Sequence, residues 1–313
     1  MRLVFLGTPE FAVPTFRKLL DSPHRVVSVF TQSDKPAGRG GKIASPPIKN
    51  LALEEGIPVY QPERLNSDVW LPIFESLQAD AYVVVAYGRI LPAWLIGIPK
   101  HGAINLHASL LPRYRGAAPI NWAIANGEVI TGVTTMRIDT GLDTGGILLQ
   151  ESVQIGPEVT APDLHDRLAH LGADLMLKTL DALESGAVTS VPQANELASQ
   201  APILKKSDGL IDWTMSSSAV NNRIRGFNPW PGTYTFLNGS LVRIWKSHPV
   251  EISSANQAPG TLIRHPVLGA MVFCSPGQLQ LLEVQPENRK RMSAIDFLNG
   301  IRLGEGRILL LGR

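Results

Sequence analysis

An amide, an imidazole and a carboxylate stand at Asn105, His107 and Asp143 of this 313-residue chain. Asn105 and His107 are two residues apart at the end of an apolar run, residues 102–107, that predicts a strand, so both side chains can point to one face. Asp143 lies in a loop rich in glycine, which lets backbone approach a ligand closely. Together these groups can hold an oxyanion, move a proton and tune the group that moves it.

Each of the three residues also has a plainer interpretation when it is taken alone. A single histidine at a strand end is more often structural, asparagine is common in turns, and Asp-Thr-Gly is a common turn tripeptide. Their place along the chain favours chemistry, because ligands of an open α/β sheet bind beyond the carboxyl ends of its strands. Spacing by itself leaves both interpretations open.

The elements that must position these residues alternate between strands and helices in the first part of the chain. We expect strands at 1–8, 25–31, 57–60, 81–86 and 102–107, with helices at 9–20, 48–55, 69–77, 117–126 and 162–183. Residues 131–137 and 146–154 are typical of paired strands at the edge of the sheet. The pattern predicts an α/β fold with a Rossmann-like, doubly wound and mostly parallel sheet.

The chain changes character after residue 190. Residues 191–204 are polar, contain prolines and lack periodicity, which predicts a linker between a catalytic domain, 1–190, and a second domain, 205–313. The second part contains short strand-like runs at 209–213, 232–237, 241–250, 260–263, 270–274 and 279–284, and probable helix patterns at 216–225 and 293–299. Asn238-Gly239 is a hairpin turn signal. These features predict a small OB-like β-barrel.

Charge is distributed unevenly over the two parts. Residues 1–203 contain 16 Lys/Arg and 20 Asp/Glu, a net charge of −4, whereas residues 204–313 contain 13 and 7, a net charge of +6. A basic second domain suggests a polyanionic partner. On charge alone, an ordinary solvated surface explains the difference equally well.

Several classes of protein and site are disfavoured by the sequence. The one cysteine, Cys274, lies in an apolar run and is expected to be buried rather than reactive. The chain shows no signal peptide and no apolar run long enough to span a membrane, so we expect a cytoplasmic protein without a membrane partner. Gly7-Thr8-Pro9-Glu10 lacks a dinucleotide fingerprint. The histidines show no spacing typical of zinc ligands, so we expect no metal.

Three elements of this chain closely resemble those of the 10-formyltetrahydrofolate-dependent formyltransferases and occur in the same order. They are Asn105-Leu106-His107, Ser109-Leu110-Leu111-Pro112 and the loop residue Asp143. The resemblance implies that Asn105, His107 and Asp143 are catalytic and that 10-formyltetrahydrofolate is the donor. It also assigns folate binding to two segments, which comprise Ser109, Leu110, Leu111 and Pro112 together with Gly88, Arg89, Ile90 and Leu91. Core packing is the alternative for Ile90 and Leu91.

The C-terminal segments resemble the branch of this family that formylates methionyl initiator tRNA. They are 205–213, 224–232 and 292–300. The Gly/Pro-rich loop 34–47 resembles the loop with which that branch enters the tRNA acceptor stem, although its composition alone fits a mobile surface loop. The resemblance implies tRNA contacts by Arg39, Lys42 and Lys35, and we expect Lys205 and Lys206 to add others. We expect a monomer that does not bind DNA.

Two other functions stay open at this point. Formylation of an amino-sugar nucleotide shares the catalytic segment but has no obvious use for a basic second domain or the 34–47 loop. A non-catalytic RNA-binding protein that retains the fold belongs to a different class. Glycinamide ribonucleotide formyltransferases share the segment but are much shorter. An assay with these acceptors beside charged initiator tRNA separates the alternatives.

Overall fold

The computed structural model describes residues 1–37, 42–250, 257–304 and 308–312, and the chain folds into two compact units. Unit 1 comprises Met1–Gly116, Ile130–Gln154 and His165–Ala201, and unit 2 comprises Ala117–Val129, Ile155–Leu164 and Pro202–Arg313. The chain leaves unit 1 for the last time after Ala201, within the segment predicted as a linker. The limits of the functional domains stay a prediction.

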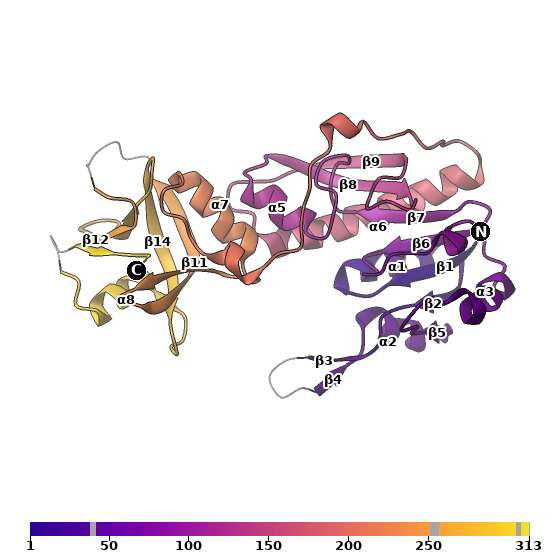
Figure 1. The fold of residues 1–313 in the computed structure, drawn as a ribbon, viewed down its shortest axis with the longest axis horizontal. Helices are drawn as coiled ribbons and strands as arrows, with labels where there is room; N and C mark the ends of the chain where they lie inside the picture. The colour runs from indigo at the N-terminus through magenta and orange to yellow at the C-terminus, as the bar shows by residue number, and fades with distance from the viewer. Residues whose placement is uncertain (38–41, 251–256, 305–307, 313) are drawn as a thin grey trace. The chain divides into compact units, whose positions relative to one another are not determined.

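Unit 1 is built on a seven-stranded sheet with the order β5-β2-β1-β6-β7-β8-β9 (Figure 1). The strands are β1 Arg2–Gly7, β2 Arg25–Phe30, β5 Val59–Tyr60, β6 Ala81–Val85, β7 Ala103–His107, β8 Ile130–Arg137 and β9 Ile147–Gln154. The five strands from β5 to β7 in this order are parallel, whereas β8 and β9 continue the sheet at one edge with antiparallel pairing. The predicted Rossmann-like, mostly parallel sheet is confirmed.

Helices cover both faces of this sheet, which explains why its central strands are apolar throughout. The helices assigned to unit 1 are η1 Glu10–Ala12, α1 Val13–Leu20, α2 Pro47–Glu54, α3 Ser67–Ser76, α4 Ala93–Ile96 and η2 Asn195–Leu197, with most of α6 Ala161–Glu184. On one face, the rings of Phe5 and Phe16 of α1 lie 4.9 Å apart. On the other, Phe74 of α3 stacks on Phe30 at 4.2 Å. The long helix α6 runs along β7 and β8 (Figure 1).

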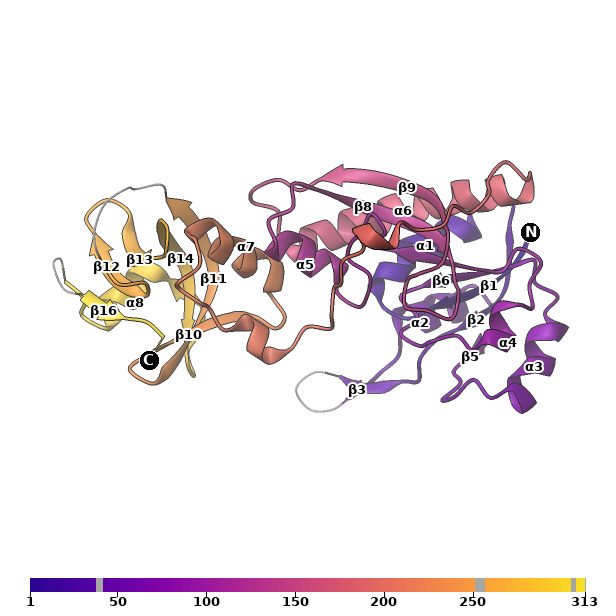
Figure 2. The same cartoon turned by 45° about the horizontal axis from the view of Figure 1, so that its top comes forward.

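Unit 2 contains a seven-stranded antiparallel sheet that nearly closes on itself (Figure 2), with the main strand order β10-β11-β14-β13-β12-β16. Its strands are β10 Thr233–Leu237, β11 Ser240–Val250, β12 Thr261–His265, β13 Gly269–Phe273, β14 Gln278–Pro286, β15 Met292–Ser293 and β16 Ile308–Leu310, with β15 paired to β14. Leu237 pairs with Leu311, which joins the two ends of the sheet. The predicted small barrel is confirmed.

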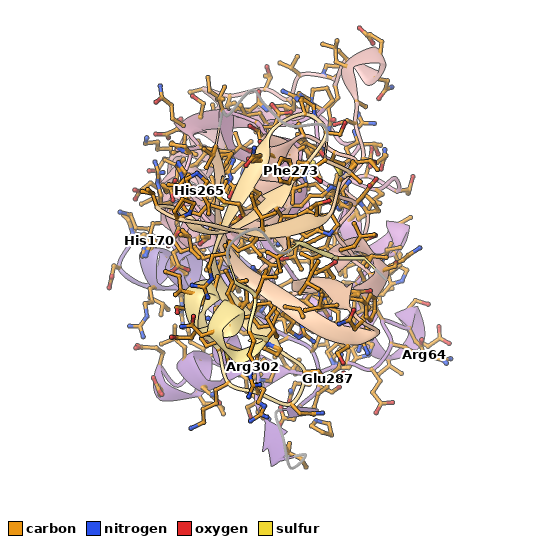
Figure 3. The ribbon with its side chains drawn as sticks, turned by 90° about the vertical axis from the view of Figure 1, so that its left-hand side faces the viewer. Arg64, His170, His265, Phe273, Glu287 and Arg302 are labelled. Carbon is orange, nitrogen blue, oxygen red and sulfur yellow. The ribbon has the colours of Figure 1, made fainter. Side chains whose placement is uncertain are left out.

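Apolar side chains form the core of unit 2, and charged side chains lie on its surface. Ile244, Leu279 and Val284 are completely buried in its core, whereas Glu287 and Arg302 are exposed (Figure 3). The helices of this unit are α5 Pro119–Ala125, α7 Ser217–Phe227, α8 Ala294–Gly300 and the short η3 Lys206–Gly209. Burial raises the pKa of the Cys274 thiol to about 12, so this cysteine stays neutral, and its predicted burial is confirmed.

The prediction of a strand at 209–213 was wrong. Residues Lys206–Gly209 form the 3-10 helix η3, and only an isolated bridge joins Leu210 to Tyr234. The backbone N–H of Lys205 donates to Asp208 Oδ2 at 2.7 Å, and the N–H of Asp208 donates to the Lys205 carbonyl at 3.0 Å. Such local hydrogen bonds compete with strand pairing.

The segment predicted as the irregular loop 34–47 contains a hairpin. Lys35–Ala37, strand β3, pairs antiparallel with Lys42–Ala44, strand β4 (Figure 1). Pro36 lies opposite Ile43, which is 75% exposed. The proline and glycine content favoured the prediction of a loop. Proline is nevertheless tolerated in an edge strand, so the pairing can form.

Candidate active site

Strand β7 carries Asn105 and His107 to the carboxyl edge of the sheet. Asn105 pairs with Val84 of β6 and Met136 of β8, and His107 pairs with Thr134. The two-residue spacing puts both side chains on one face of the strand. Asn105 is partly exposed, and among the described residues nothing forms a hydrogen bond with its side-chain amide. This amide is therefore available as a donor.

His107 is 6% exposed, and its neighbours fix the role of each ring nitrogen. Nε2 lies 2.8 Å from the backbone carbonyl oxygen of Tyr114. A carbonyl can only accept, so Nε2 carries a proton and donates it. Nδ1 lies 3.6 Å from Oδ2 of Asp143. Nδ1 is consequently the nitrogen that can gain or lose a proton in the site.

A backbone N–H holds the Asp143 carboxylate. The N–H of Gly116 donates to Asp143 Oδ2 at 2.8 Å. The backbone of Asp143 has a φ of 54°, in the left-handed region that residues other than glycine rarely adopt. Upstream, Asp139 Oδ1 accepts from the N–H of Gly141 at 3.0 Å and from Thr144 Oγ1 at 2.7 Å, which shapes the loop. The structure thus brings Asp143 to His107.

The segment Ser109–Pro112 turns directly after β7 and is anchored from β8 and β9. Thr134 Oγ1 donates to the Ser109 carbonyl at 2.6 Å and accepts from the N–H of Leu111 at 3.1 Å. Gln150 Nε2 donates to the Leu111 carbonyl and to Thr134 Oγ1, both at 2.9 Å. Ser109 and Leu111 are buried by this arrangement, whereas Leu110 and Pro112 are partly exposed and can meet a ligand.

The segment that follows β6 carries the other residues expected to bind folate. Gly88 has a φ of 76°, and its carbonyl, like that of Tyr87, accepts from Gln32 Nε2. Arg89 donates to the Glu63 carbonyl. Ile90 is 84% exposed, whereas Leu91 is 4% exposed and lies in the core. Ile90 can therefore touch a ligand, and core packing accounts for Leu91.

The residues expected to contact tRNA are described unequally. Arg39 lies outside the described residues, and Lys42 is placed by its backbone in β4. Lys35 Nζ donates to Gln32 Oε1 at 2.7 Å. Lys205 and Lys206, in unit 2, are exposed. At the base of the hairpin, hydrogen bonds from Lys49 and then Gln61 hold the pKa of the Asp34 carboxyl below its usual value.

Other supports of the site had no recognisable signal in the sequence. Thr134 and Gln150 lie in an ordinary alternating strand pair, and Gln193 lies in the segment predicted as a linker. In the part of the chain that the structure describes, no three His, Cys, Asp or Glu side chains gather as metal ligands. No helix in the described ranges is long and apolar enough to cross a membrane.

Comparison with known proteins identifies the family. The model of the formyl transferase family matches residues 1–180, and that of the formyl transferase C-terminal domain matches residues 203–302. A methionyl-tRNA formyltransferase from Geobacter sulfurreducens is 48% identical over 98% of this chain and 96% of its own length. One from Solibacter usitatus is 51% identical over 97% of each chain. The chain belongs to the methionyl-tRNA formyltransferase family.

The fold of this methionyl-tRNA formyltransferase family member is also that of a more distant enzyme. The structure of the N-formyltransferase from Helicobacter canadensis, in complex with folinic acid and dTDP-3-aminofucose, matches 91% of this chain and 98% of its own, with a TM-score of 0.69. At 21% identity, that likeness concerns the fold alone. The family resemblance drawn from Asn105, His107 and Asp143 is confirmed, while their roles stay predictions.

Proposed function

We propose that this protein transfers the formyl group of 10-formyltetrahydrofolate to the α-amino group of methionyl initiator tRNA. The product is N-formylmethionyl-tRNA for translation initiation. The observation that carries the proposal is the 48% to 51% identity to methionyl-tRNA formyltransferases over nearly the whole chain, both units included. The geometry around β7 supplies the groups that the chemistry needs.

The donor is proposed to lie at the carboxyl edge of the sheet between the two segments that follow β6 and β7. Ile90 and the partly exposed Leu110 and Pro112 offer apolar contacts, and Gln32 fixes the Gly88 segment through hydrogen bonds to the Tyr87 and Gly88 carbonyls. Folinic acid in the Helicobacter canadensis N-formyltransferase supports a folate as the donor. No metal is proposed.

Formyl transfer places charge on two atoms that these residues can serve. The amine nitrogen attacks the formyl carbon, negative charge develops on the formyl oxygen, and the bond from that carbon to N10 then breaks. The Asn105 amide can donate to this oxygen, and one such donor contributes about 3 kcal/mol in other enzymes. His107 Nδ1 can take the proton that the amine loses and return it to N10. Asp143 Oδ2, 3.6 Å away, faces this nitrogen and can orient the ring.

The acceptor is proposed to be bound partly by unit 2, which contains the basic C-terminal part, 204–313. Lys205 and Lys206 are exposed there, Lys35 and Lys42 belong to the paired strands β3 and β4 in unit 1, and Arg39 lies between them in the sequence. Lysine and arginine supply the phosphate contacts that dominate RNA affinity. We propose a cytoplasmic monomer with no DNA or membrane partner, whose catalytic domain is 1–190, linker 191–204 and tRNA-binding domain 205–313.

The test is an acceptor assay with purified protein and 10-formyltetrahydrofolate. Three acceptors are compared: charged initiator tRNA, an amino-sugar nucleotide and glycinamide ribonucleotide. We expect formylation of the tRNA only. Turnover of the sugar nucleotide in preference to tRNA would reassign the acceptor, and tRNA binding without any formyl transfer would make the protein a non-catalytic RNA-binding protein.

A further inference from the structure

We propose that Gln193 is a positioning residue that sets the Asp143 carboxylate against His107, and that residues 191–201 act as a strap over the catalytic loops. This inference rests on the proposed function, since it concerns the same site. It starts from the finding that the end of unit 1, predicted as a linker, is packed against the two loops that form the site.

Backbone hydrogen bonds fix both ends of the strap. Val191 and Ile147 exchange two hydrogen bonds of 2.8 Å, just beyond the Asp143 loop. At the other end, the N–H of Arg115 donates to the Ser199 carbonyl at 2.8 Å, and the N–H of Ala201 donates to the Arg115 carbonyl at 2.7 Å. A Cβ on Gly116 would lie 2.7 Å from the Ala201 carbonyl oxygen, so the strap also lies directly against Gly116.

Gln193 lies between these ends and binds both loops through one side chain. Its Nε2 donates to the carbonyl oxygens of Asp143 at 2.9 Å and Gly145 at 2.7 Å. Its Oε1 accepts from Arg115 Nε at 3.0 Å and Nη2 at 2.7 Å. Two donated and two accepted hydrogen bonds use the full capacity of the amide. No other type of side chain of this length offers both functions.

Arg115 makes this arrangement firmer. Its side chain is 6% exposed, and it is bonded to the amide oxygens of Gln193 and Asn195 rather than to a carboxylate of the described residues. A guanidinium bonded to Oε1 polarises the Gln193 amide and strengthens the hydrogen bonds that its Nε2 donates. The next residue, Gly116, donates its N–H to Asp143 Oδ2. Gln193 therefore holds the backbone of Asp143, and Gly116 holds its carboxylate.

The conformation of Asp143 is one that needs such support. Its φ of 54° is unfavourable for a residue with a side chain, and the surroundings must maintain it. The two Nε2 hydrogen bonds hold the carbonyls of Asp143 and of Gly145, on either side of Thr144. Without them, the loop can relax, and Oδ2 leaves its place 3.6 Å from His107 Nδ1. Displacements of about 1 Å in an active site can cost up to ~100-fold in rate.

Three variants test the assignment with initiator tRNA as the acceptor. Gln193→Ala removes the hydrogen bonds to the two carbonyls and to Arg115, and Gln193→Glu keeps the acceptor for Arg115 but cannot donate to the two carbonyls. We expect both to lower kcat by about 10-fold or more while donor KM changes little. Asn195→Ala, the matched comparison, removes the other Arg115 partner but no hydrogen bond to the Asp143 loop, and it should lower kcat much less than either Gln193 variant. Equal activity of Gln193→Glu and wild type would overturn the donor role.

A double-mutant cycle distinguishes positioning from general support. If Gln193 acts through Asp143, Gln193→Ala should lower kcat much less in an Asp143→Asn background than in the wild type. Multiplicative losses would overturn the inference.

Hydrogen exchange at the Gly116 amide provides a readout that does not require turnover. Gln193→Ala should accelerate exchange there, as should Asp143→Ala, which removes the acceptor, while Asn195→Ala should change it much less. If exchange at Gly116 is unchanged in folded Gln193→Ala protein, Gln193 does not position Asp143 and the inference is wrong. If wild-type protein formylates no tRNA, the proposed function fails, and this measurement still decides whether Gln193 holds Asp143.

Discussion

At the scale of single residues, the hydrogen bond from His107 Nε2 to the Tyr114 carbonyl determines which ring nitrogen is free to exchange a proton. It leaves Nδ1 as the atom that can exchange a proton, and it directs that atom toward Asp143. A histidine whose second nitrogen is fixed in this way keeps one tautomer and one ring orientation. The orientation of the His107 ring is therefore fixed by the protein itself.

Removing the groups that act on developing charge should affect turnover more than binding. We expect Asn105→Ala and His107→Ala each to lower kcat by about 10² or more, with a smaller change in donor KM. Asn105→Asp is the matched control for shape, because it keeps the size of the side chain and removes its N–H donors. Steady-state kinetics with charged initiator tRNA measure both parameters. A folded variant with near-wild-type kcat contradicts the role of that residue.

Asp143 is expected to act by charge, and Asp143→Asn tests this. An asparagine oxygen can still accept the Gly116 N–H, whereas the negative charge 3.6 Å from His107 Nδ1 is lost. We expect lower turnover and a displaced pH–rate profile, because the charged group that faces Nδ1 is replaced by a neutral amide. The profile of kcat/KM against pH is the measurement. A profile that coincides with that of the wild type is evidence against coupling between Asp143 and His107.

At the scale of elements, the site depends on edge strands that contribute no catalytic group. Strands β8 and β9 hold the Ser109–Pro112 turn through Thr134, which is completely buried and joins the Ser109 carbonyl, the Leu111 N–H and Gln150. The antiparallel edge of the sheet thus shapes the turn that follows the parallel strand β7. Binding and catalytic residues on loops need a rigid support of this kind.

Thr134→Val should loosen the donor pocket. The substitution conserves shape but leaves buried polar partners unsatisfied, which costs about 1–3 kcal/mol each. We expect a lower melting temperature and a several-fold weaker affinity for the folate donor, with less effect on kcat. Thr135→Val is the matched control, since Thr135 is equally buried but bonds to Thr179 and Leu149, away from the turn. Equal loss of folate affinity in both variants would show that burial, not the turn, matters.

The sequence predicted the elements whose signal is local. Apolar runs such as 81–86 identified the central strands, and Asn238-Gly239 identified the turn between β10 and β11. The family resemblance, rather than spacing, selected Asn105, His107 and Asp143 as the site. The strap at 191–201 and the anchors Thr134 and Gln150 could not be predicted, because their hydrogen bonds join residues distant in sequence and leave no periodicity. The strap is polar because its residues form hydrogen bonds with the loops. This composition resembles that of a solvated linker.

At the scale of the whole molecule, the charge split between residues 1–203 and 204–313, −4 against +6, suits a large polyanionic acceptor. Lys35 is a poor probe of tRNA contact, because it bonds to Gln32, which in turn bonds to Gly88 in the proposed folate segment. Its substitution can alter donor and acceptor sites together. Arg39 is a better probe, since it is predicted to contact the acceptor end and no role in the donor site is assigned to it.

Arg39→Ala should weaken the use of initiator tRNA and leave folate binding unchanged. Each lost phosphate contact releases about one counterion fewer, so kcat/KM for tRNA should depend less steeply on salt. Lys205→Ala and Lys206→Ala should act in the same direction if they also contact phosphates. Lys178→Ala, which removes an exposed lysine paired with Glu151, controls for net charge and should retain the wild-type slope. The measurements are kcat/KM across a salt series and folate affinity by fluorescence. Altered folate affinity with an unchanged salt slope would place Arg39 at the donor site instead.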